Sequence, residues 1–86
     1  MYKAIIIDDE PWTILDIEQT FALENMGFEI VGSFRSPLKA LPFIMSKKPE
    51  LIITDIRMPG MSGLELIQKV RSHHLNCEFI IVSGYN

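Results

Sequence analysis

The chain is short, moderately apolar and slightly acidic. It has 86 residues, of which 48% are hydrophobic and 22% are charged, and its formal net charge is -3. This length corresponds to one domain at most, and the composition excludes a disordered or fibrous protein. A dense Lys/Arg cluster, the usual footprint of a nucleic-acid or anionic-lipid surface, is missing. We therefore expect any contact with DNA to be made by a region outside this chain.

The first residues and the cysteine content indicate the compartment. The start Met1-Tyr2-Lys3 lacks the basic and apolar regions of a signal peptide, and the single cysteine, Cys77, excludes an internal disulfide. Apolar runs stay well below the roughly 18 residues of a membrane span. The predicted location is the cytoplasm, without membrane contact.

Two apolar runs end in carboxylates. Residues 4–7 (Ala-Ile-Ile-Ile) precede Asp8 and Asp9, and residues 51–54 (Leu-Ile-Ile-Thr) precede Asp55. Short runs rich in β-branched residues are typical of buried strands. Each of these two strands is therefore expected to carry acidic side chains at its carboxyl end.

Helical segments separate the predicted strands. The first helix is expected to run from Pro11 to a stop at Gly27, and the second from Ser36-Pro37 to Lys47-Lys48, kinked or shortened by Pro42. The third begins at a Ser-x-x-Glu capping box, Ser62 to Glu65, with an apolar face that includes Leu64. Further strands are predicted at residues 28–34, in an edge position, and at residues 78–82.

The alternation of strands and helices predicts a parallel sheet. Right-handed βαβ connections place the carboxyl ends of all strands at one rim of such a sheet. Asp8, Asp9, Asp55 and Ser83 follow three of these strands, so we expect their side chains to converge.

The predicted acidic rim indicates a magnesium site. Neighbouring carboxylates repel one another unless a cation joins them, and Mg²⁺ prefers oxygen ligands, including those of a substrate phosphate. With its charge neutralised, a carboxylate can attack a phosphoryl group and form an acyl phosphate. Asp55, alone at its strand end, is the predicted nucleophile.

The combined motifs resemble those of a known family. Asp8-Asp9, Asp55, the Met58-Pro59-Gly60 loop with Gly63, and Ser83-Gly84 resemble the receiver domain of two-component response regulators. The resemblance covers the whole chain and implies a CheY-like, flavodoxin-like α/β fold with three layers and strand order 2-1-3-4. By this resemblance, residues 1–86 are the N-terminal portion of a receiver domain, with the fifth strand and the last two helices missing.

The resemblance also implies roles for individual residues. A histidine kinase would phosphorylate Asp55, Asp9 would bind Mg²⁺ directly, and Asp8 would assist largely through water. The backbone carbonyl of Arg57 would complete the protein ligands, and Ser83 would be the switch hydroxyl.

The same resemblance suggests an output through DNA. Transcription would be regulated by an absent output domain. Residues 8–12, together with residues 83–85, look like the regulators that carry AraC-type helix-turn-helix domains.

One alternative to a phosphoacceptor remains open, and another is disfavoured. Receiver domains carry a phosphate-pairing lysine on the fifth strand, and no lysine here matches it. The chain could then be a noncatalytic interaction fragment that is not productively phosphorylated and self-associates through the exposed edge of residues 79–82. A magnesium-dependent phosphohydrolase is disfavoured, because such enzymes usually place a second acid where Arg57 stands. We expect a signalling domain rather than an enzyme.

Four residues near the predicted site have more than one interpretation. Trp12 is expected to pack at the start of the first helix, with a kinase-docking role as the minority interpretation. Arg57, Met58 and Met61 line the loop after Asp55, where they either gate the site, face solvent or fill gaps.

Overall fold

The computed structural model describes residues 1–20, 22–73 and 75–82. Its elements, in chain order, are β1 (Tyr2–Ile7), α1 (Pro11–Thr20), the 3₁₀ helix η1 (Leu23–Met26), β2 (Phe28–Phe34), α2 (Pro37–Lys47), β3 (Leu51–Asp55), α3 (Gly63–Ser72) and β4 (Glu78–Val82). All strands are parallel and form one sheet in the order β2-β1-β3-β4. This is the predicted flavodoxin-like order.

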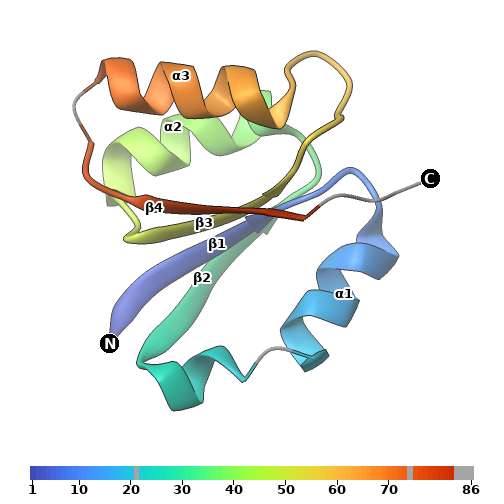
Figure 1. Cartoon of the computed structure of the whole chain (residues 1–86), viewed down its shortest axis with the longest axis vertical. Helices are drawn as coiled ribbons and strands as arrows, with labels where there is room; N and C mark the ends of the chain where they lie inside the picture. The colour runs from blue at the N-terminus through green and yellow to red at the C-terminus, as the bar shows by residue number, and fades with distance from the viewer. Residues whose placement is uncertain (21, 74, 83–86) are drawn as a thin grey trace.

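Helices cover both faces of the sheet, which gives the predicted three layers (Figure 1). α2 and α3 lie on one face and α1 lies on the other. Ile5 and Ile7 of β1 belong to the core beneath α2 and α3, whereas Ala4 and Ile6 belong to the core beneath α1. Because successive strand residues point to opposite faces, one continuous apolar run fills both cores. Among the described residues, no helix has the length and apolar character needed to cross a membrane.

The first helix ends earlier than predicted. α1 stops at Thr20, and the turn η1 then leads to Gly27, which caps η1 with a φ of 87°. Ile14 and Ile17 are buried against the sheet, whereas Leu15 is exposed. The side of α1 that carries Ile14 and Ile17 therefore faces the core, and the side that carries Leu15 does not.

Other expectations about the helices were wrong in part. α2 continues through Pro42 to Lys47, so it is not shortened. Pro42 is exposed, so its missing N–H lies on the solvent side of the helix, where water can bind the backbone carbonyl left without a donor. Trp12 is 76% exposed and Leu64 is 58% exposed, which contradicts their predicted packing.

The start of α3 lies in close contact with the end of β3. The predicted capping box is present, because Ser62 Oγ accepts from the Glu65 N–H at 3.1 Å and Glu65 Oε1 accepts from the Ser62 N–H at 2.9 Å. Gly63 N–H donates to the carbonyl oxygen of Ile56 at 2.7 Å. A Cβ atom at Gly63 would collide with the carbonyl oxygen of Asp55. Only glycine fits here without movement of the backbone.

This close approach predicts a stability effect. Gly63→Ala should lower the free energy of unfolding by about 1–3 kcal/mol, because the added methyl group meets backbone rather than a movable side chain. Gln68→Ala, on the exposed side of α3, is the matched control and should stay within about 0.5 kcal/mol of wild type. Urea unfolding measures both. Equal stability of Gly63→Ala and wild type would contradict the contact.

Candidate functional site

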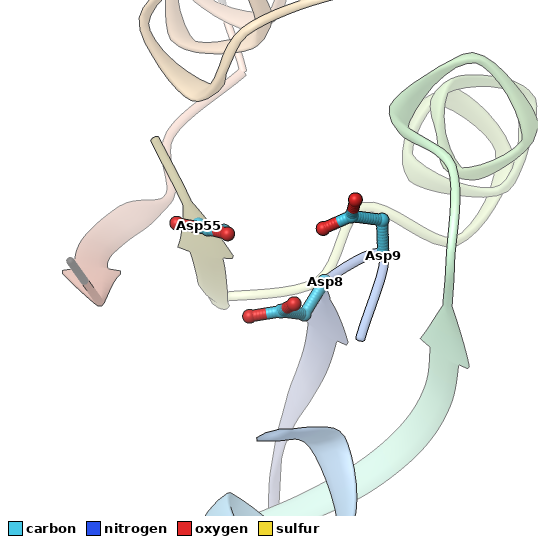
Figure 2. Close-up of side chains that lie close together, drawn as sticks. All are labelled: Asp8, Asp9 and Asp55. Carbon is cyan, nitrogen blue, oxygen red and sulfur yellow. The ribbon is translucent and has the colours of Figure 1, made fainter. Parts of the chain in front are cut away.

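Three aspartates meet at the rim where the strands end. Asp8 and Asp9 follow β1, and Asp55 is the last residue of β3. One carboxylate oxygen of each lies within 4.8 Å of those of the other two. Figure 2 shows the three carboxylates around a common space. The predicted convergence of these acids is therefore observed.

Pairing of the central strands brings the acids together. Ile7 of β1 is the register partner of Thr54 of β3, so Asp8 and Asp55 are the next residues on two adjacent strands. β1 and β3 are the inner strands of the sheet, and residues 4–7 are fully buried. The position of the carboxylates is thus set by the two buried central strands of the sheet.

Asp8 is held by the backbone around it. Its N–H donates to the carbonyl oxygen of Phe34 at 2.9 Å, which continues the pairing of β1 with β2. Its Oδ1 accepts from the N–H of Glu10 at 2.9 Å. The carbonyl oxygen of Glu10 in turn accepts from Thr13 N–H at 3.0 Å in the first turn of α1. Asp8 therefore connects the sheet to the start of α1.

Asp55 is also bound to its own backbone. Its Oδ1 accepts from the N–H of Ile56 at 2.7 Å. Its carbonyl oxygen accepts from the hydroxyl of Thr54 at 3.0 Å. Both bonds involve the peptide group that joins Asp55 to Ile56, so this group is held at its two ends.

The electrostatics of the cluster favour a cation. Asp8 is only 3% exposed, and this burial is the main reason why its pKa is raised above the usual value. The N–H of Glu10 lowers that pKa, but the negative charges of Asp55, Asp9 and Glu10 raise it further. Every charged group that acts on Asp8 is therefore acidic. A bound cation would relieve both the burial and the repulsion.

The donor atoms fit the magnesium ion expected from the sequence. The cluster offers carboxylate oxygens only, without the imidazole or thiolate groups that zinc favours. Two of the carboxylates are partly exposed, which leaves room for the waters that Mg²⁺ retains. Asp8, Asp9 and Asp55 are the residues that would hold the ion.

Two further residues, Arg57 and Ser83, were predicted to belong to the site. Arg57 lies in the loop after β3 with an exposed side chain, and the ligand role of its carbonyl stays a prediction. Ser83 lies outside the described residues.

Lys47, the last residue of α2, does not approach the acidic cluster. It lies at the opposite rim of the sheet, where its carbonyl oxygen accepts from Lys3 Nζ at 2.7 Å.

The sequence interpretation overlooked the hydroxyl next to Asp55. Thr54 is 1% exposed, and the signal for it was an uncharged polar residue between an apolar run and the acid that ends the strand. The two loop methionines, Met58 and Met61, are buried in the core beneath α2 and α3. They pack in that core, as the gap-filling interpretation predicted, and they do not face solvent.

Sequence comparisons agree with the geometry. The family model of the response regulator receiver domain matches residues 4–86. The transcriptional regulatory protein YesN of Bacillus subtilis is 36% identical over 85 residues, which cover 99% of this chain and 23% of YesN. HptR, a transcriptional regulatory protein of Staphylococcus aureus, is 35% identical over 86 residues, which cover all of this chain and 33% of HptR. The chain thus spans a third or less of these two relatives.

Solved structures show the same fold. The receiver domain of the response regulator NarL from Mycobacterium tuberculosis superposes with a TM-score of 0.86 at 26% identity, over 99% of this chain and 68% of that chain. The receiver domain of AraT from Geobacillus stearothermophilus gives a TM-score of 0.89 at 27% identity, over 98% of this chain and 65% of that one. With a family match over nearly its whole length and an acidic cluster at the carboxyl rim, the chain belongs to the response regulator receiver family.

Proposed function

We propose that the chain is the phosphoacceptor portion of a two-component response regulator. Asp55 receives a phosphoryl group from a histidine kinase, with Mg²⁺ held by Asp8, Asp9, Asp55 and the carbonyl oxygen of Arg57. The observation that carries this proposal is the three-carboxylate cluster at the ends of β1 and β3. Domain membership supports it, because the matched family is a signalling domain.

The chain's own groups suit the transfer. Asp55 is partly exposed at the strand end, so a donor can approach its carboxylate. A carboxylate oxygen of Asp55 attacks phosphorus as the bond from phosphorus to the donor's imidazole nitrogen breaks, and the electron pair leaves with that nitrogen. Bound Mg²⁺ would supply charge neutralisation for the phosphoryl oxygens.

The product would be an acyl phosphate on Asp55. Ser83, the residue after β4, is proposed as the hydroxyl that turns towards this phosphoryl group. Asp8 and Asp9, on the neighbouring strand end, would still hold the ion.

The biological output is proposed from the relatives. YesN and HptR are transcriptional regulatory proteins of which this chain spans 23% and 33%. We infer that DNA is contacted by another region of such a regulator, in the cytoplasm, and the net charge of -3 supports this division. The AraC-type output domain stays a prediction.

A second candidate function is an interaction fragment that is not productively phosphorylated. β4 is at one edge of the described sheet, and its Ile80 is 46% exposed. An uncovered strand edge with apolar side chains can pair with another chain. This observation favours self-association through β4.

Phosphorylation tests the first candidate. Incubation with Mg²⁺ and acetyl phosphate should add one phosphoryl group, detected by intact mass, and Asp55→Asn should abolish the adduct. Asp16→Asn, at an exposed position of α1, is the matched control and should be labelled like wild type. A chain that stays unlabelled, while a longer version of its reading frame is labelled, would favour the second candidate. Continuous phosphate release from many substrates would contradict both.

The raised pKa of Asp8 predicts a stability effect in the absence of metal. An acid with a higher pKa in the folded than in the unfolded state binds more protons when folded, so stability falls as pH rises through this interval. Asp8→Asn keeps an oxygen for the Glu10 N–H but removes the charge. The variant should therefore melt at a higher temperature than wild type at pH 7 without metal, and the difference should shrink at acidic pH.

Magnesium should stabilise wild type more than Asp8→Asn. At ten times its dissociation constant, the ion should stabilise wild type by about 1.4 kcal/mol, because it binds only the folded cluster. This corresponds to roughly 5–10 °C for a domain of this size. Asp8→Asn should gain much less, whereas Asp16→Asn should gain as much as wild type. Thermal melts with and without Mg²⁺ at constant ionic strength measure these shifts.

Light scattering tests self-association. If β4 pairs with a second copy, the mass should rise with concentration, and Ile80→Lys should lower it by placing a charge at the edge. Glu29→Lys, at an exposed position on the other edge strand, is the control for added charge. A constant monomeric mass over a wide concentration range, with a cooperative melt, would exclude the pairing.

A further inference from the structure

The peptide group between Asp55 and Ile56 is bound at both ends. Its carbonyl oxygen accepts the Thr54 hydroxyl at 3.0 Å, and its N–H donates to Asp55 Oδ1 at 2.7 Å. A peptide group is planar and rigid, so a rotation of the carbonyl also turns the N–H. The Thr54 hydroxyl is therefore mechanically coupled to the carboxylate of Asp55.

We propose that Thr54 is a positioning residue for the phosphoacceptor. Its hydroxyl sets the orientation of the Asp55–Ile56 peptide, and this orientation directs the Asp55 carboxylate towards Asp8 and Asp9. The inference rests on the proposed function, because it assigns Thr54 a part in binding the cation and accepting the phosphoryl group.

Burial makes the hydroxyl a fixed partner. Thr54 is 1% exposed, so water does not compete for its hydrogen. Its acceptors are the Asp55 carbonyl oxygen at 3.0 Å and Met58 Sδ at 4.0 Å, and a thioether is a weak acceptor. The hydroxyl therefore donates its hydrogen bond to the Asp55 carbonyl oxygen. The β-branched side chain also has restricted χ1 freedom, so the donor stays in place.

The next peptide group is fixed from the other side. The carbonyl oxygen of Ile56 accepts from the N–H of Gly63 at 2.7 Å. Gly63 also lies against the Asp55 carbonyl so closely that no Cβ fits. Thr54 and the start of α3 thus hold the two peptide groups that lead to Arg57, whose carbonyl is the remaining proposed ligand.

Two substitutions separate positioning from packing. Thr54→Val keeps the branched shape and removes the hydroxyl, whereas Thr54→Ser keeps the hydroxyl and removes a methyl group. Each loses one interaction in a buried site, so both should lower the melting temperature by a few degrees. If Thr54 only packs, site function follows the melting temperature in both variants. If Thr54 positions Asp55, only Thr54→Val loses site function.

The affinity for Mg²⁺ and the rate of labelling are the first readouts. Calorimetric titration should show about tenfold weaker Mg²⁺ binding to Thr54→Val, the loss typical when a group that orients a metal ligand is removed. Labelling of Asp55 by acetyl phosphate should slow by about the same factor. Thr54→Ser should stay close to wild type in both measurements.

Amide exchange in the metal-free protein is an independent readout. The Ile56 N–H should exchange faster in Thr54→Val than in Thr54→Ser, because the peptide group loses one of its two anchors. Asp55→Asn, which keeps the Thr54 hydroxyl, should leave the Gly63 N–H protected.

The outcomes are distinguishable. Wild-type affinity and labelling in Thr54→Val would overturn the inference, and so would equal losses in Thr54→Ser and Thr54→Val. Either result leaves the proposed function intact. A wild-type chain that takes neither Mg²⁺ nor a phosphoryl group would instead overturn the proposed function, and this inference with it.

Discussion

Parallel pairing of β1 with β3 is the interaction on which the rest of the structure depends. These inner strands bury side chains on both faces, so they join the two cores into one molecule. In their register Ile7 lies opposite Thr54, so the two strands end at the same rim and Asp8 and Asp55 follow at matching positions. The acids that follow are consequently neighbours. The apolar packing of the strands holds together carboxylates that would otherwise separate.

The cluster opposes the stability that this packing provides. Asp8 is buried beside two other acids, and both its burial and their charges favour its protonated form. A small domain has only about 5–15 kcal/mol of net stability, so this conflict is significant. A bound cation would relieve the repulsion between the carboxylates. The free energy recovered in this way would add to the affinity of the site for the cation. This conflict supports the proposed role of the cluster in holding Mg²⁺.

The peptide group after Asp55 links three parts of the site. It bonds to the Thr54 hydroxyl and to the Asp55 carboxylate, and its carbonyl oxygen leaves no space for a Cβ atom at Gly63. This arrangement joins the strand end to the start of α3. A change in the conformation of the loop would therefore also move the carboxylate. The fold around it superposes on receiver domains at 26–27% identity, which shows that few side chains have to be shared for this geometry.

The sequence by itself determined the strands, the second and third helices and the meeting of Asp8, Asp9 and Asp55. Runs of β-branched residues, a capping box and right-handed connections are local or general rules, and they were sufficient for these features. The strand order came from the family resemblance, and the early end of α1 was not predicted. Only the tertiary structure decided which apolar residues are buried, because this depends on what each helix face meets. Trp12 is exposed for that reason, and the contact of Thr54 with the Asp55 carbonyl became visible only once the chain was folded. Periodicity specifies a face, but packing against distant segments decides whether that face is covered.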